Sequence, residues 1–152
     1  MKNAPLIDAL NRAIALEHAA GLQYQHQALV VRGLWRPVYA PRFAEASQES
    51  FGHAELFGQK VVALGGVPTL EVAVTKQSLV LEEMLEHALD VETKALDAYR
   101  QALELAGDDV ALTTMLEDQI KAETDDVEEL ELLLSEIRSV VSRRDAALRS
   151  AS

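Results

Sequence analysis

Two glutamates occupy positions on helical stripes where this chain otherwise places apolar residues, and they constrain its fold more than any other feature. Glu92 lies seven residues after Leu85 and seven before Tyr99, so the three side chains share one helix face at about 100° per residue. Glu123 repeats the pattern, with a leucine seven residues to either side. A carboxylate on a core stripe is costly unless a partner compensates its charge. Two such stripes in consecutive helices predict a shared partner, for which a metal ion is the simplest candidate.

Composition narrows the class of protein further. The 152 residues are enough for one domain with a substantial core, and 49% hydrophobic with only 5% aromatic residues favours packed helices over strands. The net charge of −11 argues against a nucleic-acid partner, and the absence of cysteine excludes disulfides, thiolate metal sites and thiol catalysis. Apolar runs are too short to span a bilayer and no signal peptide is evident. We therefore expect a cytoplasmic protein without a membrane partner.

Hydrophobic periodicity predicts four long helices. They cover about Pro5–Arg32, a start between Pro37 and Pro41 through Leu64, about Ser78–Ala106, and about Asp109–Val141. The segment 65–78 lacks a 3.6-residue period and is predicted to be a long, mostly extended crossover. Residues 142–152 either continue the last helix or form a short fifth one, and we expect one domain over 1–145 with a tail at 146–152. Short first and third links with a long middle one predict an all-α four-helix bundle with a crossover between helices two and three.

Each predicted helix carries an acid, a histidine or both at mid-length on its inner face. The set comprises Glu17, His53 with Glu49 or Ser50, Glu92, and Glu123 with Asp126. Taken singly, each could be a satisfied core residue. Taken together and in register, they fit carboxylate-bridged di-iron bundles, in which two helices give a Glu each and the other two give Glu-x-x-His pairs. Four of them are acids (Glu17, Glu92, Glu123 and Asp126) and sum to −4, a charge that a pair of divalent cations would neutralise.

Several segments carry a family resemblance. They are Glu17 followed by Tyr24, His53-Ala-Glu with the later Leu-Gly-Gly-Val-Pro-Thr-Leu at 64–70, Glu-Glu-Met-Leu at 82–85 followed by Glu92, and Glu123-Thr-Asp-Asp126. On these segments the chain resembles bacterioferritins and close ferritin-like relatives over nearly its whole length.

The resemblance implies a ferritin-like bundle that binds iron, about two ions per chain as in di-iron bundles, and oxidises Fe(II) with O₂ or peroxide. The implied metal ligands are Glu17, His53, Glu92, Glu123 and Asp126, with Glu92 as the best candidate for a bridge and Glu49 or Ser50 left open. Tyr24 is either a packing residue or a participant in the redox reaction. The resemblance also implies a homo-oligomer, either a dimer or a hollow storage shell.

Three positions depart from the family pattern. Ser50 stands where the family has a bridging glutamate, and Glu49 lies one residue away from that position. Asp126 replaces the second histidine, which exchanges a nitrogen ligand for an oxygen and favours harder metals. Phe51 stands at the methionine that ligates haem between bacterioferritin subunits, so we predict no haem.

These departures keep other interpretations open. The centre could hold one iron or another divalent metal, or so little metal that the chain has only a structural or assembly role. A further alternative is a di-metal oxidoreductase that acts on a small substrate without storing iron. That alternative requires a pocket that opens onto the metals.

Overall fold

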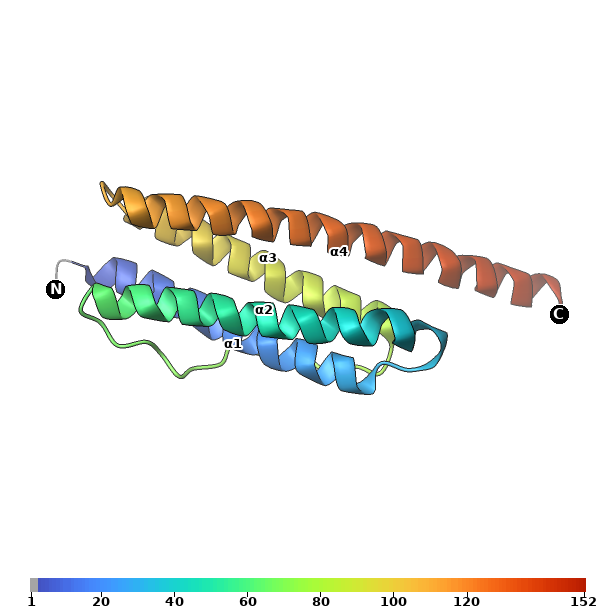
Figure 1. Cartoon of the computed structure of the whole chain (residues 1–152). Coiled ribbons are helices and arrows are strands. Elements are labelled where there is room, and N and C mark those ends of the chain that lie inside the picture. Colours follow the sequence, from blue (N-terminus) through green and yellow to red (C-terminus); the bar gives the residue numbers. More distant parts are fainter. Residues whose placement is uncertain (1–2) are drawn as a thin grey trace.

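The computed structural model describes residues 3–152 and consists of helices joined by loops (Figure 1). Four long helices follow one another: α1 (Ala4–Val30), α2 (Arg36–Ala63), α3 (Leu81–Leu105) and α4 (Val110–Ser150), with a short 3-10 helix, η1 (Gly33–Trp35), before α2. Residues 3–152 contain no strand. The predicted all-α four-helix bundle with a long crossover is therefore confirmed. Within the described residues, no helix is both long and apolar enough to cross a membrane.

Local sequence signals explain where two of the helices begin. The prolines near the start of α2 left its first turn open in the sequence, and the helix begins at Arg36. Pro37 then lies in the first turn, where a missing N–H has no intrahelical partner to lose, and Pro41 lies inside the helix. Before α4, Asp109 is the N-cap, because its Oδ1 accepts the N–H of Leu112 at 2.9 Å.

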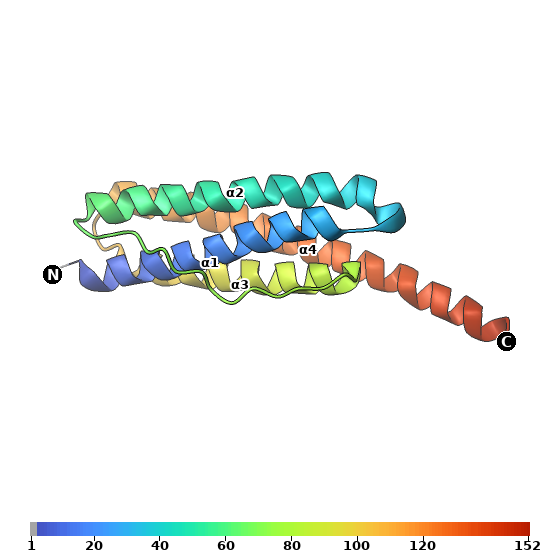
Figure 2. The same cartoon turned by 90° about the horizontal axis from the view of Figure 1, so that it is seen from below.

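The helices form a bundle with one open side. The chain reverses between α1 and α2, returns along the bundle through the crossover 64–80, and reverses again between α3 and α4 (Figures 1 and 2). α1 packs against α2 and α3, and α4 packs against α3. No Cα atom of α2 lies within 8 Å of one in α4. Side chains rather than close backbone packing must therefore span the α2–α4 side.

The crossover is held to α1 by a series of hydrogen bonds. Asn11 Oδ1 accepts the N–H of Thr69 at 2.9 Å, and the carbonyl of Ala15 accepts the N–H of Ala73 at 2.9 Å. Further along, Gln23 Oε1 accepts the N–H of Lys76 at 3.0 Å. These bonds satisfy backbone groups of a segment without secondary structure, which explains how it can follow the bundle closely.

The core consists of two apolar clusters with a polar layer between them. One cluster includes Ile14, Phe57 and Leu116, and the other includes Phe43 and Leu130. On every helix the change from one cluster to the other falls at a polar side chain: Glu17 on α1, Ser50 and His53 on α2, Glu92 on α3, and Glu123 on α4. The bundle therefore buries its acids in a single layer at mid-length.

α4 is much longer than its partners and projects beyond the bundle (Figures 1 and 2). Its inward stripe continues past the last buried residue, Ile137, but every residue from Ser139 to Ser152 is exposed. Residues 142–150 thus continue the fourth helix, one of the two arrangements that the sequence left open.

Deleting residues 141–152 is expected to lower the melting temperature of the bundle by less than about 2 °C, because exposed side chains contribute little to the free energy of unfolding. Replacing the neighbouring buried Ile137 by alanine should instead cost about 2–4 kcal/mol. Thermal unfolding followed by circular dichroism would compare the two variants. A large loss of stability in the truncated protein would contradict the expectation and indicate that the projecting segment packs against something.

Candidate metal centre

The polar layer contains three carboxylates that water barely reaches. Glu17 and Glu123 are each 1% exposed and Glu92 is 6% exposed, although each is surrounded by the apolar side chains of its own helix stripe. His53 on α2 faces the same layer and is only partly buried. Burying this many ionisable groups in one layer is unfavourable unless they share protons or a cation.

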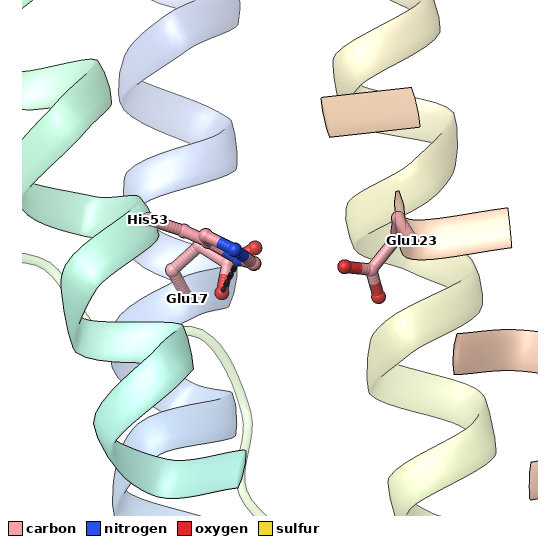
Figure 3. A group of neighbouring side chains, drawn as sticks. All are labelled: Glu17, His53 and Glu123. Carbon is pink, nitrogen blue, oxygen red and sulfur yellow. Dashed lines mark ion pairs between the residues drawn. The ribbon is translucent and has the colours of Figure 1, made fainter. Parts of the chain in front are cut away.

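Three of these side chains converge on one point. Glu17, His53 and Glu123 each present a ligand atom, and these atoms all lie within 4.8 Å of one another. Glu17 and His53 meet across the α1–α2 interface, with Glu17 Oε2 at 3.6 Å from His53 Nδ1, while Glu123 reaches toward them from α4 (Figure 3). One nitrogen and two carboxylate ligands around a shared point form a chemically reasonable cation site.

Hydrogen bonding leaves oxygens of this group unused. The hydroxyl of Tyr99 donates to Glu17 Oε1. Glu17 Oε2 and Glu123 Oε1 are buried and have no hydrogen-bond partner among residues 3–152. A buried acceptor without a partner is rare in folded proteins and requires an explanation. A cation between the two oxygens would supply one.

Burial raises the pKa of Glu17, Glu92 and Asp126. Burial, followed by the negative charge of Glu49, raises the pKa of Glu17 well above its ordinary value. Burial, followed by the charge of Glu17, raises the pKa of Glu92 to about 8. The pKa of Asp126 rises to about 6 by burial and then by the charge of Glu49. Burial, and then the charge of Glu92, also raises the pKa of the Tyr24 hydroxyl well above its ordinary value. A cation would reverse these shifts because it favours the charged carboxylates.

The remaining predicted ligands lie around this group without joining it. Glu92 is buried but interacts with the hydroxyl of Tyr24, and Asp126 is half-buried. Glu49 is exposed, with its Oε1 at 3.9 Å from His53 Nε2. Ser50 is buried, and its hydroxyl contacts Glu17. The three residues that share a point within 4.8 Å therefore do not include Glu92, Asp126 or Glu49.

A cavity of about 220 Å³ connects the layer to the α2–α4 side of the bundle. Its lining includes all the predicted ligands except Glu17, together with Tyr24, Phe43 and Leu130. At its outer part, Arg42 Nη2 on α2 forms an ion pair with Glu129 Oε2 on α4 at 2.8 Å. This pair spans the two helices whose backbones do not approach each other.

Sequence reasoning missed two residues of the centre. From the sequence, Tyr99 is predicted only to share the helix face of Glu92. A tyrosine two turns from a buried acid on the same face is a pattern from which a hydrogen bond to an acid of the layer could have been predicted. Arg42 gave no signal, because its role depends on the separation of α2 and α4. Both residues contact acids of the layer or of its cavity.

Comparison with known proteins identifies the family. The Ferritin family, described as a ferritin-like domain, matches residues 7–140. The chain belongs to the ferritin-like domain family. A crystal structure described as ferritin-like, diiron-carboxylate proteins from Bacillus anthracis str. Ames has 35% identity and a TM-score of 0.84, covering 88% of this chain and 98% of that one. A Rhodobacter capsulatus bacterioferritin, described with a metal-free dinuclear site and haem iron, has 26% identity and a TM-score of 0.80, covering 90% and 87%. No curated protein matches the chain in sequence.

The residues of this ferritin-like chain fit a divalent metal. The donors are carboxylate oxygens and one imidazole, the buried oxygens of Glu17 and Glu123 lack other partners among residues 3–152, and burial raises the pKa of Glu92 to about 8, a shift that a cation would oppose. Phe51 packs over Gly21, where its ring would lie 2.7 Å from an added Cβ atom. Phe51 stands at the position of the haem-ligating methionine of bacterioferritins, and the absence of haem that follows from this substitution stays a prediction.

Proposed function

We propose that this ferritin-like protein binds Fe(II) in the polar layer and oxidises it with O₂ or peroxide. The convergence of Glu17, His53 and Glu123 within 4.8 Å, with buried carboxylate oxygens left unpaired, is the observation that carries the proposal. Glu92 and Asp126 complete the proposed ligand set, and Glu49 or Ser50 takes the remaining position. Bound iron would supply the electrons that reduce the oxidant. About two irons per chain are expected by analogy with di-iron bundles.

The side chains that line the cavity would attract metal cations and lead them to the site. Six acids line the cavity (Glu45, Glu49, Glu92, Glu123, Asp126 and Glu129), together with one arginine, Arg42, and one histidine, His53. The negative potential of such a cleft raises the local concentration of cations. Arrival of Fe(II) would displace the proton that Glu92 holds near neutral pH, and the solvent-facing cavity gives that proton a route out. Tyr24, in contact with Glu92, is the residue that we assign to the redox reaction.

Anaerobic titration of the metal-free protein with Fe(II), followed by O₂, tests the proposal. We expect about two irons per chain and a ferric absorbance that grows much faster than in buffer. Replacing Tyr24 by phenylalanine should leave the stoichiometry unchanged and slow the oxidation. One iron or none, with oxidation no faster than in buffer, would contradict ferroxidase activity and favour a structural role for the bundle.

Replacing Ser50 by glutamate is expected to raise iron occupancy or the rate of oxidation. Ser50 is 3% exposed and lines the cavity beside Glu17, so a carboxylate there would add a ligand at the position where the family has one. The same Fe(II) titration measures the effect, and Ser47→Glu, a buried serine on the same helix outside the cavity lining, is the matched control. An unchanged or reduced occupancy would indicate that Glu49 is the working ligand.

We also propose that the protein is a homo-oligomer, either a dimer or a hollow shell that stores the oxidised iron. Exposed apolar side chains of α2 and the crossover, Phe51, Val62 and Leu70, line one open hollow together with Ile14 of α1. Exposed apolar patches of this kind commonly mark protein interfaces. Light scattering after size-exclusion chromatography measures the assembly. A monomer at every concentration would contradict this part of the proposal.

The cavity favours one alternative function, oxidation of a small molecule without storage. Its volume of about 220 Å³ and its apolar lining by Phe43 and Leu130 provide the pocket which that alternative requires. The two functions differ in iron capacity. Uptake far beyond about two irons per chain under repeated aerobic additions would favour storage, whereas a fixed low ratio would favour the oxidoreductase.

A further inference from the structure

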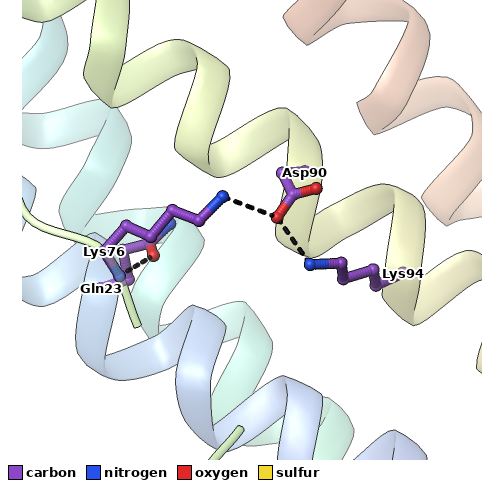
Figure 4. A network of polar contacts seen from close by, with 4 residues as sticks. All are labelled: Gln23, Lys76, Asp90 and Lys94. Carbon is purple, nitrogen blue, oxygen red and sulfur yellow. Dashed lines mark hydrogen bonds and ion pairs between the residues drawn. The ribbon is translucent and has the colours of Figure 1, made fainter. Parts of the chain in front are cut away.

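A second polar cavity, of about 210 Å³, lies between α1, the crossover and α3 and has no part in the metal centre. Its polar lining consists of Gln23, Lys76, His87, Asp90 and Lys94, four of which appear in Figure 4. Its apolar lining includes Leu16, Val74 and Val91. Three separate segments of the chain therefore meet there around a small space lined by both polar and apolar side chains.

Two ammonium groups share a single carboxylate oxygen in this cavity. Lys94 Nζ lies 2.9 Å and Lys76 Nζ 3.3 Å from Asp90 Oδ2 (Figure 4). The hydrogen bond from Lys94 is the main reason that the pKa of Asp90 is lowered, so Asp90 stays ionised. Two positive charges and one negative charge leave an excess of one positive charge. The metal cavity, with one arginine and six acids, has the opposite sign.

A buried amide group in the same cavity has an unused donor. Gln23 is 4% exposed, and its Oε1 accepts the backbone N–H of Lys76 at 3.0 Å. That bond fixes the orientation of the amide, because the opposite orientation would place two donors against each other. The Nε2 group of Gln23 is then buried without a partner among residues 3–152, as is Nδ1 of His87. Both side chains line the cavity.

We propose that this cavity binds a small carboxylate. Its ionised oxygens would accept hydrogen bonds from the ammonium groups of Lys76 and Lys94 and from Gln23 Nε2, and its charge would neutralise the excess positive charge. An organic remainder would lie against Leu16, Val74 and Val91. The single excess charge and the apolar lining favour a monoanion with a short hydrocarbon part over inorganic phosphate.

Such a ligand would tie the crossover to the bundle. Gln23 belongs to α1, Lys76 to the crossover, and Asp90 and Lys94 to α3. A carboxylate held by all three segments binds the folded chain but not the unfolded one, so it should raise the thermal stability of the protein as its concentration increases.

Calorimetric titration of the metal-free full-length protein with butyrate, at constant ionic strength, tests the proposal. Metal-free protein is used so that the carboxylate cannot bind through a metal ion. We expect saturable binding of one butyrate per chain and binding of inorganic phosphate at least about tenfold weaker. Absence of saturable butyrate binding, or tighter binding of phosphate, would overturn the proposal.

Two matched pairs of variants locate the site. Gln23→Glu keeps the acceptor for the Lys76 N–H and replaces the donor by a negative oxygen, so it should weaken butyrate binding more than about tenfold. Gln25→Glu changes the same residue type at an exposed position of α1 and should leave binding unchanged. Lys94→Gln should weaken binding about tenfold, whereas Lys121→Gln on exposed α4 should not.

Lys94 keeps the test decisive if the buried substitution unfolds the protein. Its side chain is 59% exposed, so Lys94→Gln should not disturb the fold. Unchanged butyrate affinity in Lys94→Gln would show that Lys94 does not bind the carboxylate. An equal loss of affinity in Lys121→Gln would show that butyrate responds only to the general charge of the protein. Either result would overturn the proposal. Because the readout is butyrate binding without iron, failure here would leave the proposed iron oxidation untouched.

Discussion

Replacing Glu123 by glutamine is expected to abolish tight Fe(II) binding and to make the metal-free protein more stable. Glu123 is 1% exposed, and its Oε1 has no hydrogen-bond partner in the described chain. Glutamine keeps the shape of the side chain and removes an ionisable group from a layer that already contains Glu17 and Glu92. The gain in the free energy of unfolding should be about 1–3 kcal/mol, or roughly 3–10 °C in melting temperature.

The loss of Fe(II) affinity should be at least about 100-fold, since even partners that only orient a metal ligand are worth about 10–100-fold. Anaerobic Fe(II) titration and thermal unfolding would be measured on the same preparation. Glu131→Gln, an exposed acid on the same helix, is the control and should change neither quantity. A glutamine variant that binds iron normally would remove Glu123 from the ligand set, and one that is destabilised would show that its carboxylate is satisfied in the metal-free protein.

The opposite signs of these two effects identify a functional carboxylate. A residue selected only for packing would lose stability when altered and would not affect a ligand. A buried acid that costs stability in the metal-free protein and supplies affinity with metal indicates that the chain retains it for binding. A polar side chain separates the two apolar clusters on each of the four helices, and the same comparison of stability and affinity can be made for Glu17 and Glu92.

The four-helix bundle and the inward-facing positions of its acids at mid-length could both be predicted from the sequence, because both depend on hydrophobic periodicity. A helix places residues seven apart on the same face, so the inner position of Glu17, Glu92 and Glu123 followed from their leucine and alanine neighbours. Helix ends depend on single hydrogen bonds and were less predictable. α3 begins at Leu81 and not near Ser78, because the hydroxyl of Ser78 accepts the N–H of Val80 at 3.0 Å and holds the chain in a turn.

The sequence could not predict which side chains of the polar layer come together, because that depends on distances between helices and on side-chain rotamers. Periodicity treats Glu92 and Glu123 alike. In the structure Glu123 reaches the point shared with Glu17 and His53, whereas Glu92 interacts with Tyr24. The cavity between α2 and α4 likewise results from the spacing of two helices that are distant in sequence, and no pattern within either helix reports that spacing.

The stability of the metal-free protein is expected to fall as the pH rises from 5 to 8. The pKa of Glu92 is about 8 in the folded protein and 4.5 in its ordinary state, so between these values the folded chain holds a proton that the unfolded chain has released. Raising the pH therefore favours the unfolded chain. Asp126, with a pKa of about 6, and Glu17, whose pKa is also raised, act in the same direction. With about 1.4 kcal/mol for each tenfold difference in proton affinity, the loss amounts to several kcal/mol at most.

Melting temperatures of the metal-free protein at pH 5, 6, 7 and 8 would measure this decline, which we expect to be roughly 5–10 °C. Glu92→Gln should flatten it, because the amide does not titrate, while Glu104→Gln, an exposed acid on the same helix, should leave it unchanged. Iron binding has the opposite dependence, since metal ligands must lose their protons and affinity rises with pH. The increase in melting temperature on adding anaerobic Fe(II) should therefore grow from pH 6 to pH 8. An increase that is the same at every pH would mean that the metal binds outside the layer of buried acids.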